Sequence, residues 1–249
     1  MIRGLYTSTS GMLAIQAQSE IIGDNSANIS TPGYKEEQAS LKSFSNVLLE
    51  RTGGGAGRES APSSIGNMGM GVSVDRVLKN DAIGAVQVTE RETDLALQSS
   101  GYFAVQTPEG TRYTRNGQFQ LGGEGFLQTA EGYPVLGEKG VIGPLETGFT
   151  VAQDGTVSAN GQVVDQLLIV DIPADSLTRE GASLYNTNYP VTQVVKPEVQ
   201  QGAIEGSNVD IADQTVQMMS AMRAYEANQK VIQTLDKTLD KAVNEIGRV

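Results

Sequence analysis

The chain has 249 residues, with 18 basic and 29 acidic side chains and a formal net charge of −11. It contains no histidine, cysteine or tryptophan. These absences exclude Ser-His-Asp and Cys-His catalysis, disulfides, and metal centres built on thiolates or imidazoles. The acidic balance argues against a nucleic-acid partner, because phosphate binding needs a basic face. We therefore expect no cofactor, no metal site and no nucleic acid.

The amino end gives no sign of a targeting segment. Residues 1–8 contain no apolar stretch followed by a small-residue cleavage site. Nowhere in the chain do about 18 apolar residues follow one another, as a membrane-spanning helix requires. We expect no membrane insertion, and a protein that either stays in the cytosol or leaves the cell by a route without a cleaved signal.

The first 30 residues have the spacing of a helix. Apolar and small residues recur in steps of three and four, which predicts a helix over residues 5–29 with an apolar seam. The hydroxyl residues in the seam let another helix approach closely. Thr31-Pro32-Gly33 should end the helix, because proline cannot continue it. The seam consists of Leu5, Ser8, Met12, Ile15, Ser19, Ile22, Ser26 and Ile29.

The middle of the chain changes period. Residues 35–67 are predicted to be a Gly/Ser-rich linker or extended loop, with a glycine cluster at 53–57. Residues 68–204 predict an antiparallel β domain, because short strand-like runs alternate with turn signals and no helix-length pattern intervenes. The expected strands are 72–77, 84–88, 102–105 and 163–170, and the expected turns are 108–110, 116–117, 122–125, 154–155 and 160–161.

The carboxyl end predicts a long helix. An apolar seam runs from Ile211 to the last residue in steps of three and four, and a helix of about 38 residues would span about 57 Å. A heptad pattern of this length is typical of a coiled coil. Gln214 and Asn228 are the two clearly polar seam residues. Either they select register and partner, as a buried asparagine does in coiled coils, or the seam drifts and both face water.

The predicted fold class is therefore α+β, with amino- and carboxyl-terminal helices that form an α-helical coiled coil and a central antiparallel all-β domain. The terminal-helix domain is discontinuous (residues 1–34 and 205–249). We expect the two seams to pack against each other within and between subunits. The residues expected at subunit interfaces are Leu5, Met12, Ile15, Ile22, Ile29, Met218, Met222, Tyr225, Asn228, Ile232, Leu235 and Leu239.

No residue pattern selects a catalytic site. A carboxylate pair for glycoside or peptidoglycan cleavage is open on composition alone, but the spacing of the acidic residues in the β region favours no particular pair. We therefore expect no enzyme, with a cell-wall hydrolase or sugar-binding β module as the alternative. The acidic residues in question are Glu90, Glu92, Asp94, Glu131 and Asp154.

Three ordered motifs occur along the chain. The first comprises residues 8–12 and 25–35, the second 94–98, 101–105 and 113–119, and the third 201–210 and 222–232. Together they resemble the rod and hook proteins of the bacterial flagellar axis, over nearly the whole chain. The residues that match the terminal signatures of this family are Asn25, Asn28, Gly33, Tyr34, Ser207, Asn208, Val209, Arg223, Ala224, Tyr225 and Glu226.

The resemblance implies a structural subunit of the flagellar basal-body rod. Such proteins pair their terminal helices into a coiled-coil tube and stack helically into a drive shaft that carries motor torque to the hook. The implied partners are further copies of the chain, other rod and hook proteins, and the flagellar export apparatus, which carries the unfolded chain across the inner membrane. The length and the short segment between Tyr34 and Gly71 favour the rod subclass, with a hook or hook-associated protein as the alternative.

Overall fold

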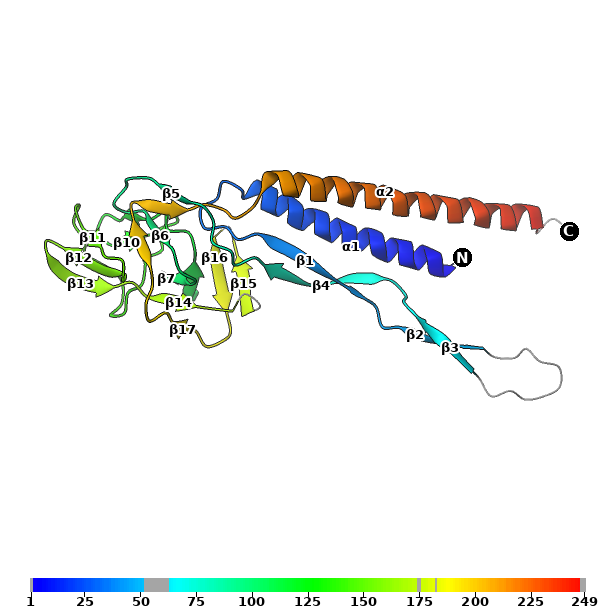
Figure 1. The fold of residues 1–249 in the computed structure, drawn as a ribbon, viewed down its shortest axis with the longest axis horizontal. Helices are drawn as coiled ribbons and strands as arrows, with labels where there is room; N and C mark the ends of the chain where they lie inside the picture. Colours follow the sequence, from blue (N-terminus) through cyan, green and yellow to red (C-terminus); the bar gives the residue numbers. More distant parts are fainter. Residues whose placement is uncertain (1, 52–62, 174–175, 182, 247–249) are drawn as a thin grey trace. The chain divides into compact units, whose positions relative to one another are not determined.

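The computed structural model of the chain describes residues 2–51, 63–173, 176–181 and 183–246. Helix α1 (Ile2–Ala27) and helix α2 (Ile211–Lys241) flank a series of strands, and a short π-helical turn (Ala242–Ile246) follows α2 (Figure 1). All strand pairs whose register is known are antiparallel. The predicted α+β class with a central antiparallel β region is therefore confirmed. Among the described residues, no helix is long and apolar enough to cross a membrane.

Helix α1 ends two residues earlier than the sequence predicts. It stops at Ala27, and Ile29 lies in a turn, so its assignment to the helical seam was wrong. The backbone N–H of Asn28 donates to Asn25 O at 3.2 Å, and that of Thr31 donates to Asn28 O at 3.1 Å. These three-residue bonds replace the helical four-residue pattern ahead of Pro32, which disfavours helical geometry in the residue before it.

Most of the predicted linker is a pair of β-ribbons. Strand β1 (Glu37–Ser43) pairs with β4 (Val72–Lys79), and β2 (Val47–Arg51) pairs with β3 (Ser63–Met68). The expectation of a loop over 35–67 is wrong for these strands, because ladder hydrogen bonds between backbones hold them whatever their serine and glycine content. The glycine cluster at 53–57 lies outside the described residues.

The central strands form several small antiparallel sheets. The largest has the strand order β15-β16-β8-β7-β14-β17, and a three-stranded sheet has the order β11-β12-β13. Two-stranded pairs join β9 to β10, β6 to β18, and β5 to β19. The strands are β5 (Val86–Val88), β6 (Leu95–Leu97), β7 (Tyr102–Thr107), β8 (Gly110–Thr114), β9 (Gln120–Leu121), β10 (Leu127–Gln128), β11 (Thr150–Val151), β12 (Thr156–Ala159), β13 (Gln162–Gln166), β14 (Ile169–Asp171), β15 (Leu177–Glu180), β16 (Leu184–Thr187), β17 (Thr192–Gln193), β18 (Val199–Gln201) and β19 (Ala203–Glu205).

Two details of the predicted strand pattern were wrong. The run 163–170 is divided between β13 and β14, which belong to different sheets. Asn116-Gly117 makes no hairpin turn, because this segment pairs with the one at the start of β6: the Leu95 N–H donates to Gly117 O at 2.9 Å, and Gln118 forms an antiparallel bridge with Asp94. Asn160-Gly161, by contrast, connects β12 to β13 with φ values of +51° and +77°, as a tight Asn-Gly hairpin requires.

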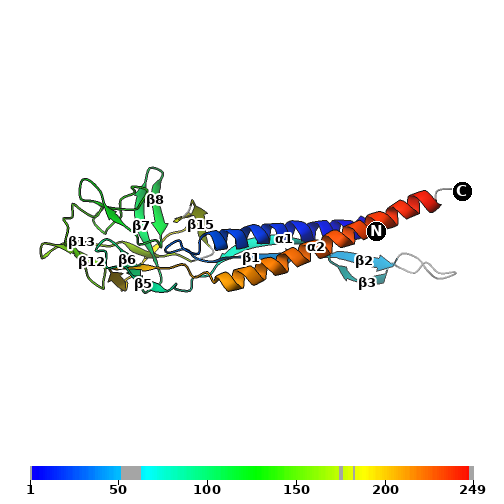
Figure 2. The same ribbon diagram turned by 90° about the horizontal axis from the view of Figure 1, so that it is seen from above.

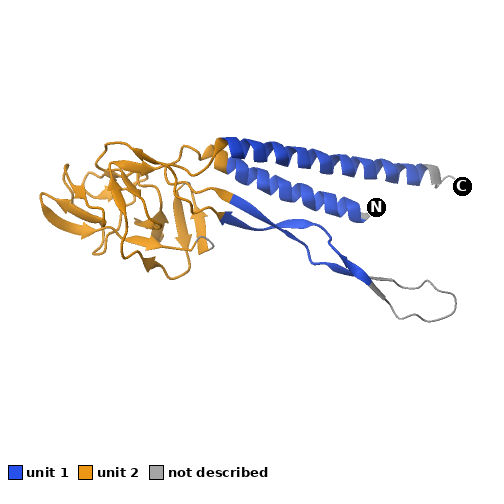
Figure 3. Ribbon diagram, in the orientation of Figure 1, with its two compact units in different colours: residues 1–24, 38–78, 212–249 blue, residues 25–37, 79–211 orange. Residues whose placement is uncertain are grey.

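The chain divides into two compact units (Figure 3). The first, called here the helix–arm unit, comprises residues 1–24, 38–78 and 212–249. The second, the β unit, comprises residues 25–37 and 79–211. The β unit has its own apolar core around Phe103 and Phe119, whose rings meet edge to face with centroids 5.2 Å apart. The segment that follows α1 therefore belongs to the β unit and not to the helices.

Candidate functional site

The β unit contains a cluster of three buried charged residues. The carboxylate of Glu205 lies between two cations: Lys35 Nζ is 2.7 Å from Oε1, and Arg115 Nε donates to Oε2. The side chains of Lys35, Arg115 and Glu205 are 4%, 2% and 1% exposed. We call these residues the ionic cluster. Glu205 follows Lys35 by 170 residues and Arg115 by 90 residues in the sequence. The cluster therefore joins three distant parts of the chain.

Backbone groups complete the hydrogen bonding of the ionic cluster. Lys35 Nζ donates to Ala82 O at 2.8 Å, and the remaining Arg115 nitrogens donate to the carbonyls of Gly101 and Leu97. The backbone N–H of Gly84 donates to Glu205 Oε1 at 3.0 Å. Burial lowers the pKa of Lys35, while the hydrogen bond and charge of Glu205 act in the opposite direction. The cluster is thus a satisfied network, which is the condition under which buried charge is tolerated.

The family-motif residues next to the ionic cluster form hydrogen bonds between the segment that follows α1 and the segment that precedes α2. The Gly33 N–H donates to Glu205 O at 2.8 Å, and Asn208 Oδ1 accepts from the Glu36 N–H at 2.7 Å. Asn208 Nδ2 donates to the carbonyls of Asn80 and Ala82 at 2.8 and 3.0 Å. The segment that follows α1 and the segment that precedes α2 are therefore bound directly to each other.

Gly33 is required by its surroundings as well as by its backbone. Its φ is +69°, a left-handed conformation that favours glycine. A Cβ at this position would overlap the backbone of Arg115. Any side chain at residue 33 would therefore push the turn away from the ionic cluster.

Asn25 and Tyr34 hold the turn that follows α1. Asn25 Oδ1 accepts from the Tyr34 hydroxyl at 3.1 Å and from the Glu37 N–H at 2.9 Å, and its Nδ2 donates to Glu37 O at 2.8 Å. The Arg179 guanidinium lies over the Tyr34 ring, 5.0 Å from its centroid. Asn28 accepts locally from Thr31 Oγ1 at 3.1 Å.

The carboxyl-terminal motif is divided between the two units. Ser207 Oγ accepts from the Val209 N–H at 3.3 Å, and Val209 is buried in the β unit. Residues 223–226 lie on α2 in the helix–arm unit, and all four are exposed. The structure thus brings Ser207, Asn208 and Val209 to the amino-terminal motif and leaves Arg223, Ala224, Tyr225 and Glu226 on the surface of that unit.

Burial along the helices follows the predicted seam. Figures 1 and 2 show α1 and α2 running in opposite directions. Gln214 is only 1% exposed, so the alternative that both polar seam residues face water was wrong for Gln214. Three of the expected interface residues, Leu5, Met222 and Tyr225, are exposed. The other expected interface residues are buried or half-buried: Met12, Ile15, Ile22, Ile29, Met218, Asn228, Ile232, Leu235 and Leu239.

Sequence reasoning missed the ionic cluster. Each of its members stands inside one of the three motifs, at the end of 25–35, within 113–119 and within 201–210. Their spacing in the sequence does not predict a contact, because the three chain segments meet only in the tertiary fold. Only Glu205 gave a signal, as a charged residue among Ala203, Ile204 and Gly206, because Lys35 and Arg115 have polar or charged neighbours.

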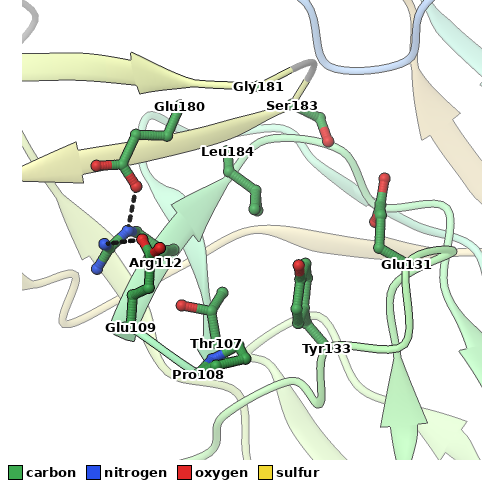
Figure 4. Close-up of a pocket in the computed structure, with 10 residues that line it drawn as sticks. All are labelled: Thr107, Pro108, Glu109, Arg112, Glu131, Tyr133, Glu180, Gly181, Ser183 and Leu184. Carbon is green, nitrogen blue, oxygen red and sulfur yellow. Dashed lines mark hydrogen bonds and ion pairs between the residues drawn. The ribbon is translucent and has the colours of Figure 1, made fainter.

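The β unit also contains an open pocket of about 460 Å³ at one end of its largest sheet. Figure 4 shows Arg112 bound to Glu180 and Glu109 on one side, with Glu131 next to Tyr133 on the other. The Arg112 partnership lowers the pKa of Glu180, which is the opposite of what a general acid needs. Of the five carboxylates considered from the sequence, only Glu131 lines this pocket.

The chain matches three family models in order. Residues 5–35 match "Flagella basal body rod protein", residues 96–159 match "Flagellar hook protein FlgE/F/G D1 domain", and residues 200–245 match "Flagellar basal body rod FlgEFG protein C-terminal". Each match contains one member of the ionic cluster, Lys35, Arg115 and Glu205 in turn.

Full-length relatives give the same result. The chain is 34% identical to the flagellar hook-basal body complex protein FlhO of Bacillus subtilis over 100% of both chains. It is 33% identical to the basal-body rod protein FlgG of the same organism over 98% of this chain and 99% of the relative. It is 30% identical to the basal-body rod protein FlgF of Caulobacter vibrioides over 100% of both chains. This chain therefore belongs to the flagellar basal-body rod protein family.

Proposed function

We propose that the chain is a structural subunit of the flagellar rod, located in the basal body, and that it polymerises helically through α1 and α2. The polymer would form the drive shaft that carries motor torque to the hook. The observation that carries this proposal is that the ionic cluster and its neighbours join the segment after α1 to the segment before α2. Because residues 33–36 and 205–208 are hydrogen-bonded to each other, tension on either terminal helix reaches the same buried network.

The exposed surface of the helices supports assembly through this unit. Apolar side chains remain exposed on α1 at Tyr6 and Leu13 and on α2 at Val216, Met219 and Met222. A helix with apolar residues on more than one face needs more than one packing partner. Methionine side chains adapt to neighbours of different shape, which suits a helix that contacts non-equivalent copies. Burial of these faces between copies would complete the coiled coil expected from the heptad seam.

The same reasoning gives the partners. Copies of the chain would pair through the exposed helix faces, and other rod and hook proteins would continue the stack at its ends. The relatives are named as rod proteins or as a component of the hook-basal body complex. Export in an unfolded state by the flagellar export apparatus accords with a chain that needs no disulfide, since it contains no cysteine.

A hook or hook-associated protein is the second candidate. It is favoured by the match of residues 96–159 to a domain model described for the hook protein as well as for the rod proteins. The shape of the polymer distinguishes the two. A rod subunit should give straight filaments from purified protein, whereas a hook subunit should give curved ones.

The proposed assembly is tested by Ile232→Asp, which places a charge in the half-buried seam of α2. Burial of an unpaired charge costs several kcal/mol, so we expect loss of filaments and of swimming. The β unit should remain folded, as measured by tyrosine near-ultraviolet circular dichroism. The matched control is Gln229→Asp, which introduces the same charge at an exposed position of α2 and should swim normally. A motile Ile232→Asp strain would refute assembly through the seam.

A further inference from the structure

The three glycines of α1 have different surroundings. A Cβ built on Gly4 would lie 3.2 Å from Leu235 Cδ1, and a Cβ built on Gly11 would lie 3.2 Å from Asn228 Nδ2. A Cβ on Gly23 would meet no atom within 4 Å. Gly4 and Gly11 therefore stand where a side chain of α2 reaches the backbone of α1, and Gly23 does not.

The contact at Gly11 involves the whole amide group of Asn228. Its Nδ2, Cγ and Oδ1 atoms lie 3.2, 3.6 and 3.6 Å from the Cβ position of Gly11. Asn228 is half-buried. The amide thus fills the space that any other residue at position 11 would occupy with its own side chain, in the manner of a knob in a hole.

The two glycine contacts belong to one register. Gly4 and Gly11 are one heptad apart, and their partners Leu235 and Asn228 are one heptad apart in the opposite direction. The apolar repeat alone sets no register, because a slip by a heptad brings one seam against the other again. A slip by one heptad would set Asn228 either against Gly4, with Ala221 facing Gly11, or against Gln18, which has a side chain of its own.

We propose that Gly11 and Asn228 are the residues that determine the register of α1 against α2. In the observed alignment Asn228 and Leu235 fill the space over Gly11 and Gly4, whereas a slip by one heptad in either direction sets an alanine, Ala221 or Ala242, against one of the two glycines. This assigns to Asn228 the role of register selection, in which Gly11 is its partner.

The consequence for assembly rests on the proposed function. Every copy in a polymer must present the same exposed faces of α1 and α2 to its neighbours. A slip by one heptad would displace these faces by about 10 Å along the helix axis. A subunit with the wrong register would therefore fold but would not fit its neighbours.

The register can be measured because the natural chain has no cysteine. Gly4→Cys with Leu235→Cys places one thiol on each helix at a native contact, and a short bis-maleimide, to which each thiol adds covalently, joins them within one chain in the full-length protein. This reporter pair is then combined with Gly11→Leu and, as matched control, with Gly23→Leu. Leucine has a high helix propensity, so neither substitution should disturb α1 itself. The two variants differ mainly in that a side chain at residue 11 meets Asn228 of α2, whereas a Cβ at residue 23 would meet no atom within 4 Å.

We expect the parent pair and the Gly23→Leu variant to cross-link at the same rate. The Gly11→Leu variant should cross-link about tenfold more slowly, because overpacking displaces the helices. The exchanged pair Gly11→Leu with Asn228→Gly restores a knob and a hole and should recover most of the rate. Equal rates in Gly11→Leu and Gly23→Leu, or no cross-link in the parent pair, would overturn the proposal.

Swimming separates this proposal from the proposed function. Slow cross-linking together with lost swimming in Gly11→Leu, tested without the cysteines, supports both. Slow cross-linking with normal swimming supports the register role and contradicts assembly through these helices. Normal cross-linking in Gly11→Leu overturns the register role whatever the motility.

Discussion

Removal of the charge of Glu205 is the most direct perturbation of the β unit. Glu205→Gln keeps the size of the side chain but leaves Lys35 and Arg115 buried without a counter-ion. Removal of one partner from a buried ion pair costs about 3–5 kcal/mol. Because one carboxylate serves two cations and also accepts from the Gly84 N–H, we expect a loss at the upper end of that range. This is a large part of the total of about 5–15 kcal/mol that stabilises a typical domain.

The loss is measured by urea unfolding of the full-length chain. Near-ultraviolet circular dichroism reports on the β unit, because Tyr102 and Tyr185 are buried there in an edge-to-face pair with centroids 5.5 Å apart. Glu198→Gln is the matched control, since Glu198 is an exposed residue of the same carboxyl-terminal segment. It should change the free energy of unfolding by less than about 0.5 kcal/mol. A Glu205→Gln variant as stable as Glu198→Gln would refute the role of the ionic cluster.

A second substitution separates charge from packing. In Lys35→Met with Glu205→Gln, one of the two uncompensated cations is replaced by an apolar side chain of similar length. The double variant should be more stable than the sum of the two single losses predicts, because neighbouring members of one network are not additive. Strictly additive losses would indicate that Lys35 and Glu205 act independently, in contradiction of the 2.7 Å contact between them.

Two further predictions concern the β unit. Burial raises the pKa of Tyr185 from 10.0 to about 12, so its contribution to stability is complete below pH 10 and should be lost, at about 2–3 kcal/mol, as the pH rises toward 12. Tyr185→Phe should therefore move alkaline unfolding, followed by tyrosinate absorbance, to higher pH, and an unchanged midpoint would contradict this. Gly33→Ala should lower the free energy of unfolding, measured in urea, by about 1–3 kcal/mol more than Gly132→Ala does. Both glycines have positive φ, but only at Gly33 do backbone atoms of another residue lie where a Cβ would be. Equal losses would refute that packing constraint.

Regular patterns were predictable from the sequence because their cause is local. The seam of α2 follows from a repeat of about 3.5 residues, and in the structure Gln214 and Ala221 are buried and Leu235 is half-buried at that spacing. The hairpin at Asn160-Gly161 follows from backbone conformations that these two residue types adopt with little strain. In both cases the determining interactions lie within a few residues of one another.

The failed predictions have tertiary causes. Asn116-Gly117 has the sequence of a hairpin turn, yet the glycine is needed there because Leu95 passes directly beside its backbone. The strands β1, β2 and β3 were hidden because residues 35–67 lack strong apolar alternation, and pairing with another segment of the chain supplies their hydrogen bonds. The strand predicted over 72–77 was confirmed as β4. The ionic cluster has the same origin, since a contact across 170 residues has no local signature.

The division into two units also gives the acidic charge a location that the sequence alone does not. The helix–arm unit carries ten basic and ten acidic side chains, and the β unit carries eight basic and nineteen acidic ones. The whole net charge of −11 therefore belongs to the β unit. The proposed polymer would bring together many copies of a unit with no net charge, so charge repulsion would not accumulate at the contacts between α1 and α2 of different copies. The negative charge of the β unit would favour solubility of the subunit before assembly.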